Sequence, residues 1–149
     1  METQVTVLMP VYNGAPYVAE AVQSVLNQSF RDFELLIIDD CSTDGTHDVL
    51  GRFSDSRIRI LRNETRMKLA GALNRGMSEA RGEYVARMDA DERCLPARLQ
   101  RQVDFLRLCD EVGICGSQVR IFGERSGTMQ YPEGRDRVKA YLLFNTPFS

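Results

Sequence analysis

The sequence predicts an α/β fold in which a mostly parallel central sheet carries helices on both faces. Strand-like runs alternate with runs of helical periodicity, an order that is typical of parallel strands joined by right-handed crossovers. The run 33–38 is almost wholly apolar, as expected of a strand buried on both faces. A chain of 149 residues has the length of one domain, and we expect a single domain over residues 1–149.

The first strand and helix are expected within the first 28 residues. The β-branched and apolar run 5–9 predicts a strand that Pro10 closes. The residues 13–14, Asn-Gly, favour a turn because both accept positive φ. Apolar residues at helical spacing predict an amphipathic helix over 16–28.

The middle of the chain predicts two further strand–helix pairs. After the strand 33–38 we expect a short helix over 46–53, and then an alternating strand over 57–62. We interpret the arginines of that strand as a solvated face rather than a phosphate-binding patch. A helix over 67–81 follows and is expected to end at Gly82 in the C′ position.

The last third predicts one more buried strand, a helix and a hairpin. The strand covers 84–88, and the helix covers 95–109 with its inward side chains at Leu99, Val103, Phe105 and Leu106. A strand over 113–122 is expected to turn back, because Gly123 and Gly127 suggest a hairpin that returns through 128–131. A final helix is expected over 135–144.

The composition excludes several classes of protein. A net charge of −2 argues against a nucleic-acid binder, which presents a basic face. No apolar run approaches the ~20 residues that span a bilayer, and residues 1–4 do not begin a signal peptide. The four cysteines show no metal-binding spacing, so we expect free thiols and a cytoplasmic protein, with membrane association left open for the full-length protein.

A strand that ends in carboxylates gives the first functional signal. The run 84–88 is followed at once by Asp89, Asp91 and Glu92, and carboxylates this close together repel one another. Mg²⁺ or Mn²⁺ would relieve that repulsion, and Mg²⁺ commonly binds through one or two carboxylates plus substrate phosphates. The alternative at this point is an acidic N-cap for the helix expected from about residue 95.

Polar residues also follow two other expected strands. Residues 11–13 come after the first strand, and Asp39 and Asp40 come after the second. The carboxyl ends of parallel strands share one edge, where open α/β sheets bind ligands, so we expect one cleft to collect these residues. We expect Asp39 to hydrogen-bond loop amides, and Ser42 and Thr43 to cap the next helix.

Three segments resemble the family 2 glycosyltransferases of the GT-A fold. They are VLMPVYN (7–13), IIDDCSTDGT (37–46) and GEYVARMDADE (82–92), which occur in the order and at the spacing of that family. The resemblance implies a glycosyltransferase that moves a sugar from a nucleotide-diphosphate sugar, commonly a UDP-sugar, with inversion and with Mn²⁺ or Mg²⁺ as cofactor. The acceptor, whether a glycan, a lipid or a protein, stays open.

The resemblance also implies roles for individual residues. These are Pro10, Val11 and Tyr12 in the nucleoside pocket, Asp40 on the uracil edge, Lys68 near the base or phosphates, Asp89 toward the ribose and metal, and Asp91 on the metal. Relatives often have Gly at the position of Lys68. Tyr12 is expected either to pack in the protein or to stack on the base.

Two departures from the family pattern concern catalysis. Glu92 stands where relatives usually have Asp, which affects the surroundings of the metal rather than its ligand. The family's catalytic base is a carboxylate further toward the C-terminus, so we expect it beyond Ser149 and assign neither Glu133 nor Asp136 to that role. The chain ends without a capping glycine or polar tail, and we expect it to be cut before the acceptor region, where a peripheral membrane contact is left open.

Two alternatives stay open, a nucleotide-sugar-binding module without catalysis and a nucleotidyltransferase. The latter should carry a Gly-rich basic loop after the first strand, which residues 10–14 are not. GxGxxG and GxxxxGK[ST] loops are absent. Residues 40–45 resemble the start of an EF-hand loop, but Gly51 stands where that loop needs Glu. A signalling receiver domain would carry its acidic pair after the first strand instead of the second.

Overall fold

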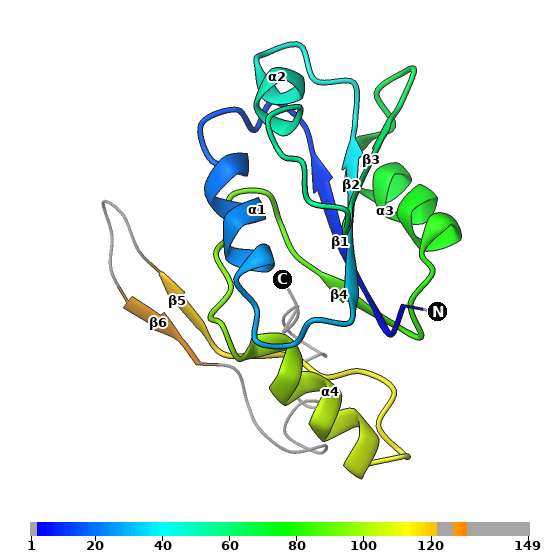
Figure 1. The fold of residues 1–149 in the computed structure, drawn as a ribbon, viewed down its shortest axis with the longest axis vertical. Coiled ribbons are helices and arrows are strands. Elements are labelled where there is room, and N and C mark those ends of the chain that lie inside the picture. The colour runs from blue at the N-terminus through cyan, green and yellow to red at the C-terminus, as the bar shows by residue number, and fades with distance from the viewer. Residues whose placement is uncertain (1–2, 122–126, 131–149) are drawn as a thin grey trace. The chain divides into compact units, whose positions relative to one another are not determined.

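The computed structural model in Figure 1 describes residues 3–121 and 127–130. The chain divides into two compact units, Met1–Asp104 and Phe105–Ser149. The first unit contains a parallel sheet with its helices, and the described part of the second contains a two-stranded hairpin. The organisation of residues 1–149 as a single domain stays a prediction.

Strands and helices alternate through the first unit, as predicted. The elements are β1 (Val5–Val11), α1 (Val18–Leu26), β2 (Phe33–Asp39), α2 (Thr46–Leu50), β3 (Ile58–Arg62), α3 (Lys68–Glu79), β4 (Tyr84–Arg87) and α4 (Arg98–Leu108), whose residues 105–108 belong to the second unit. Each observed helix lies within its predicted range, because helical periodicity marks the body of a helix better than its ends. β1 and β2 run further than predicted, to the first residues of their loops.

The four strands form one parallel sheet in the order β3-β2-β1-β4. β1 pairs with β2 over its whole length, from Val5 opposite Phe33 to Val11 opposite Asp39. Its pairing with β4 stops at Leu8. The predicted parallel α/β sheet is therefore confirmed, with β1 and β2 at its centre.

Alternate residues of β1 pack into two separate apolar layers. One layer contains α1, α2 and the start of α4, together with the β1 residues Val5, Val7, Met9 and Val11. The other layer joins Leu8 to β2 and to Ala72 of α3. Figure 1 shows α1 and α3 on opposite faces of the sheet. Because both faces are covered, every residue of β1 and β2 is buried, which explains their nearly continuous apolar sequence.

Pro10 lies inside β1, so the prediction that it closes the strand is wrong. The carbonyl of Leu8 accepts a hydrogen bond from the Met88 amide at 3.1 Å, on the β4 side. Residue 10 faces the same side as residue 8, because backbone groups alternate along a strand. β4 has ended at Arg87, so the N–H that proline lacks has no strand to bond there.

The start of α4 is capped by a side chain from a distant part of the chain. Gln28 is fully buried, donates to the Leu95 carbonyl at 2.7 Å and accepts from the Leu99 amide at 3.0 Å. The first amides of a helix have no partner inside it, and this glutamine supplies one. α4 begins at Arg98, later than the predicted residue 95.

The prediction that Gly82 is the C′ residue of the helix is wrong, because α3 already ends at Glu79. Gly82 lies where the chain passes against the start of β1, and its amide donates to the Thr6 hydroxyl at 2.9 Å. A Cβ at Gly82 would lie 2.4 Å from the Thr6 nitrogen and 2.6 Å from the Val5 carbonyl carbon. Glycine is needed here for close backbone approach rather than to end a helix.

The arginines in and before β3 are paired, so the prediction of a simply solvated face is corrected. Arg59 Nε lies 3.6 Å from the buried carboxylate of Glu34. Arg57 forms an ion pair with Asp55 at 2.8 Å, and its hydrogen bonds lower the pKa of Asp55 to about 2. Strand alternation placed these side chains on one face but carried no information about their partners.

In the second unit, β5 (Val119–Ile121) and β6 (Gly127–Met129) pair antiparallel, which confirms the predicted hairpin with shorter strands than expected. The predicted helix over 135–144 lies outside the described residues. Phe105, predicted to face inward, is exposed. The four cysteines are free thiols. Within residues 3–121 and 127–130, no helix combines the length and the apolar character needed to cross a membrane.

We expect Gly82→Ala to lower the free energy of unfolding by about 1–3 kcal/mol, because the new Cβ meets backbone atoms that cannot move aside singly. Gly51→Ala is the matched control: its Cβ would lie 3.4 Å from the nearest atom at an ordinary helical φ of −63°. Urea denaturation of both variants measures the difference. Equal stability of the two would contradict the close approach at Gly82.

Candidate functional site

A pocket of about 330 Å³ lies at the edge of the sheet formed by the carboxyl ends of the strands. It lies between the end of β1 and the turn after β4. Its lining residues are Pro10, Val11, Tyr12, Asn13, Gly14, Tyr17, Leu69, Asp89, Ala90 and Asp91. Five of the predicted site residues are therefore brought together, namely Pro10, Val11, Tyr12, Asp89 and Asp91. Asp40 and Lys68 are not among the lining residues.

Tyr17 and Leu69 line the pocket without having been predicted. The two residues are 58% and 52% exposed, although both are large and apolar. Leu69 falls on the helical stripe of α3, and such a stripe is read from the sequence as core. An apolar residue at the end of a stripe has the same sequence signal whether it is buried or borders a pocket.

A second cavity, of about 280 Å³, lies at the opposite end of the sheet. Arg57, Arg59 and Glu34 line it. Two of its three arginines, Arg57 and Arg59, already pair with Asp55 and Glu34, and the third is Arg81. The amino ends of the strands meet at this cavity, whereas open α/β sheets bind ligands at the carboxyl ends.

The loop after β1 is held to the loop after β2 by hydrogen bonds. The Asn13 amide donates to Ser42 Oγ at 3.0 Å, and the Gly14 amide donates to Thr46 Oγ1 at 2.9 Å. The Asn13 side-chain carbonyl accepts from the Thr43 amide at 2.8 Å. The predicted capping of α2 by Ser42 and Thr43 is wrong, because both residues bond to Asn13 instead.

Asp44 makes the contact with α2 that Ser42 and Thr43 were expected to make. Its carboxylate accepts from the amide of Thr46, the first residue of α2, at 2.9 Å. The other carboxylate oxygen accepts from the Ala15 amide at 3.2 Å. The hydrogen bond from the Thr46 hydroxyl is the main cause that lowers the pKa of Asp44, so this carboxylate stays ionised in its role between the two loops.

Asp39 has the structural role that was predicted for it. It is fully buried, and its carboxylate accepts from the Ser42 amide at 2.9 Å. Arg62 Nε lies 3.7 Å from the second carboxylate oxygen, and Arg62 also donates to the Ser42 carbonyl at 2.9 Å. Asp39 and Arg62 together fix the turn that follows β2.

Asp40 is buried, and its backbone amide donates to the Val11 carbonyl at 2.8 Å. One carboxylate oxygen, Oδ1, accepts from Asn63 Nδ2 at 2.6 Å and from the Met67 amide at 2.7 Å. No described residue donates to Oδ2. The side chain is therefore held in one orientation through one oxygen, and the other oxygen keeps its acceptor capacity.

Three acidic residues follow β4 within one turn. Both oxygens of the Asp89 carboxylate lie 2.9 Å from a guanidinium nitrogen of Arg87. The Glu92 carboxylate accepts from the Asp89 amide at 3.3 Å. Burial raises the pKa of Glu92, and the negative charges of Asp89 and Asp91 raise it further. Asp91 is exposed and has no hydrogen bond or ion pair with any residue in the described part of the chain.

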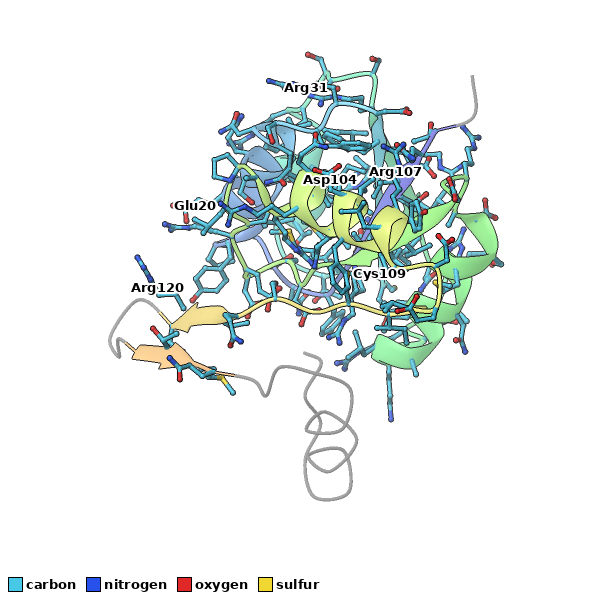
Figure 2. All side chains as sticks on the ribbon, turned by 90° about the horizontal axis from the view of Figure 1, so that it is seen from below. Glu20, Arg31, Asp104, Arg107, Cys109 and Arg120 are labelled. Carbon is cyan, nitrogen blue, oxygen red and sulfur yellow. The ribbon has the colours of Figure 1, made fainter. Side chains whose placement is uncertain are left out.

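The segment after the acidic turn is fastened along α1. Glu20 of α1, labelled in Figure 2, forms an ion pair with Arg93. The Cys94 amide donates to Ser24 Oγ at 3.1 Å. α4 begins only after this segment, at Arg98. The acids therefore do not cap α4, and the N-cap alternative is excluded for them.

The acidic turn fits a divalent cation whose remaining ligands are phosphate oxygens. No three His, Cys, Asp or Glu side chains among the described residues form a metal site on their own. Asp91 presents a carboxylate in the pocket without a partner among the described residues, and Glu92, whose pKa is raised first by burial and then by the charges of Asp89 and Asp91, lies beside it. One or two carboxylates are what Mg²⁺ uses when substrate phosphates complete its coordination.

Tyr12 lines the pocket and is 38% exposed. The guanidinium carbon of Arg66 lies 3.8 Å from the ring centroid, which is a cation–π contact. The ring is thus covered on one side by a charged residue from the loop before α3. Neither periodicity nor a motif distinguishes Arg66 in the sequence, since the contact joins two loops.

Three segments at this edge, the loops after β1 and β2 and the start of α3, each contain one non-glycine residue with positive φ. They are Asn13 at 53°, Cys41 at 63° and Lys68 at 61°, and the structure describes no others. Such backbone conformations persist only where the surroundings impose them, and they gather at binding sites. The positive φ also explains why glycine suits the position of Lys68.

Comparison with known proteins gives a family match over nearly the whole chain. The model of the family described as "Glycosyl transferase family 2" matches residues 6–148. The Escherichia coli UDP-Glc:alpha-D-GlcNAc-diphosphoundecaprenol beta-1,3-glucosyltransferase WfgD is 36% identical over 102 residues, which are 68% of this chain and 40% of WfgD. This chain spans less than half the length of the curated relatives it matches.

Two solved structures have a similar fold. Staphylococcus aureus TarS 1–349 in complex with UDP-GlcNAc has a TM-score of 0.68 and 26% identity, covering 72% of this chain and 32% of TarS 1–349. The mannosyltransferase PcManGT from Pyrobaculum calidifontis, in complex with GDP-Man and Mn²⁺, has a TM-score of 0.64 and 32% identity, covering 69% of this chain and 32% of its own. The expectation of a GT-A fold is confirmed.

We expect Lys68→Gly to raise the free energy of unfolding by up to about 1 kcal/mol, because glycine adopts a positive φ without steric cost. Lys68→Ala removes the same side-chain charge but keeps the Cβ, and should stay within about 0.5 kcal/mol of the unmodified chain. Denaturant midpoints of the three proteins give the comparison. A glycine variant no more stable than the alanine variant would show that this backbone is not strained.

Proposed function

This chain belongs to glycosyl transferase family 2, and from that premise we propose that it forms the donor-binding part of an enzyme that transfers a sugar from a nucleotide-diphosphate sugar to an acceptor. We propose a UDP-sugar as donor and inversion at the sugar carbon. The observation that carries the proposal is the pocket at the carboxyl-end edge, where the end of β1 faces an acidic turn with an unpaired carboxylate. TarS bound to UDP-GlcNAc and the UDP-Glc donor in the name of WfgD support the uridine nucleotide.

The nucleoside is proposed to lie against the end of β1, on Pro10, Val11 and Tyr12. Asp40 would accept the N3–H of uracil through Oδ2. The support is that Oδ1 already has two donors and Oδ2 has none among the described residues. An ionised carboxylate only accepts hydrogen bonds, so it suits a base edge that donates one.

Asp91 is proposed to hold Mn²⁺ or Mg²⁺ against the donor diphosphate, with Asp89 beside it toward the ribose. The bound ion would neutralise charge that develops on the leaving nucleoside diphosphate. Arg87 pairs with Asp89, which leaves Asp91 as the less encumbered of the two carboxylates. Lys68 precedes the pocket residue Leu69 and would meet the phosphates with its ammonium group.

No described residue is assigned as the general base. Glu133 and Asp136, the late acids that the sequence offers, lie outside the described residues. We propose that the base and the acceptor contacts come from other parts of the full-length protein, since the relatives are more than twice as long as the matched region. The acceptor itself is left unassigned.

We expect UDP to bind this chain at least roughly tenfold more tightly with Mn²⁺ or Mg²⁺ than with EDTA, because the diphosphate and the acidic turn are both anionic and need a cation between them. Isothermal titration calorimetry with UDP under the three conditions measures the effect. Uridine, which has no phosphates, is the control and should bind equally in all three. Equal UDP affinity with and without metal would remove the cation from the proposal.

Asp91→Asn should abolish the metal-dependent gain in UDP affinity while changing the stability of the metal-free chain by less than about 1 kcal/mol, because an exposed carboxylate without a partner contributes little to folding. Asp48→Asn, at an exposed acid of α2 away from the pocket, is the matched control. Calorimetry and thermal melting report the two quantities. A clear loss of stability with intact UDP binding would make Asp91 a structural residue.

A further inference from the structure

A chain of hydrogen bonds runs from α3 to the carboxylate that is proposed to read the base. The guanidinium of Arg75, on α3, donates to the side-chain oxygen of Asn63. Asn63 Nδ2 in turn donates to Asp40 Oδ1 at 2.6 Å. Arg75 also donates to the Arg62 carbonyl at 2.8 Å, which anchors its guanidinium beside Asn63.

The position of Asn63 is fixed by its backbone and by burial. Its amide donates to the Asp39 carbonyl at 2.8 Å, so the residue continues the ladder past the end of β2. Its side chain is almost fully buried, as is that of Asp40. In such a place neither amide atom of Asn63 can turn to water for a partner, and each must be satisfied by a neighbour.

Arg75 and Asp40, on opposite sides of the Asn63 amide, fix its orientation. An arginine has only donors, so it must face the Asn63 oxygen, and the nitrogen of that amide must then face Asp40. With the reverse orientation, the Asn63 oxygen would meet the Asp40 carboxylate and the nitrogen would meet a guanidinium, and both contacts would be repulsive. The charges of Arg75 and Asp40 together therefore give Asn63 a single orientation.

We propose that Arg75 is a positioning residue that selects the nucleobase: through Asn63 it fixes Asp40 Oδ1, so that Oδ2 is left as the acceptor that faces the base. This inference rests on the proposed function, in which Asp40 accepts from uracil. Asp40 Oδ1 receives Asn63 Nδ2 and the Met67 amide, and these two donors set the rotation of the carboxylate. Removing Arg75 deprives the buried Asn63 oxygen of its donor, so Asn63 is held less firmly and the rotation of the Asp40 carboxylate is less well fixed.

The nucleobase provides a measurement that a purely structural role would not change. Uracil carries a donor at N3, whereas cytosine carries an acceptor there, so an oriented carboxylate favours UDP over CDP. The ratio of the CDP and UDP dissociation constants cancels the metal and diphosphate terms, which the two nucleotides share. We expect Arg75→Met to reduce this ratio by about five- to tenfold, the effect of losing one oriented hydrogen bond.

Four comparisons complete the experiment, all by calorimetry with Mn²⁺ present. Arg75→Lys should largely restore the ratio, because its ammonium group still donates to Asn63. Arg101→Met, at an exposed arginine of α4, should leave the ratio unchanged. Asn63→Ser should itself lower the ratio, and adding Arg75→Met to it should change the ratio by less than about twofold, because the path is already broken.

The outcomes separate this inference from the proposed function. If Asp40→Ala lowers the ratio and Arg75→Met does not, the positioning role is overturned and the base contact stands. If Asp40→Ala leaves the ratio unchanged, Asp40 does not contact the base, and the positioning role of Arg75 is overturned as well. Thermal melting checks that each variant is folded at the titration temperature. If Arg75→Met is not folded at that temperature, Arg75→Gln replaces it, because the glutamine side chain is too short to donate to Asn63.

Discussion

The register between β1 and β2 sets the positions of the two loops that follow these strands at the candidate site. Val11 pairs with Asp39, and the next hydrogen bond along, from the Asp40 amide to the Val11 carbonyl, starts both loops at the same level. A slip of one residue would turn Asp39 and Asp40 to each other's faces, because side chains alternate along a strand. Burial of both strands on both faces makes such a slip costly.

The loops at this edge hold backbone strain and compensate for it through mutual bonds. Asn13 and Cys41 both have positive φ, and the segments around them are joined by the bonds from Asn13 to Ser42 and Thr43. Neither loop has a regular ladder of its own at this point. Each therefore depends on the other for its conformation, so that a rigid binding edge is built from two irregular segments.

Sequence patterns predict the sheet well because its residues obey local rules. The apolar runs at β1 and β2 are long and unambiguous, and the acids after β2 and β4 mark their loops. The features that escape prediction are contacts between segments far apart in the chain. Gln28 satisfies the first amides of α4, and Gly82 admits a close pass of the backbone beside Thr6. Neither requirement leaves a periodic trace.

The same distinction applies to the candidate site. Residues after the strands, such as Asp89 and Asp91, were found because strand ends collect ligands at one edge. Arg66 and Arg75 could not be found, since arginines in a helix or loop are ordinarily solvent-facing. Their significance depends on what lies opposite them, namely the ring of Tyr12 and the amide of Asn63. Only the assembled edge brings these partners together.

Pro10 has a consequence for the shape of that edge. β1 and β4 pair as far as Leu8. The next residue of β1 whose backbone faces β4 is Pro10, which has no N–H to donate. The two strands therefore fork at this point, and the acidic turn departs from β1 instead of continuing beside it. The pocket lies where the two segments separate, with Pro10 of β1 on one side and Asp89, after β4, on the other. A proline within β1 thus prevents the β1–β4 hydrogen-bond ladder from extending across the binding edge.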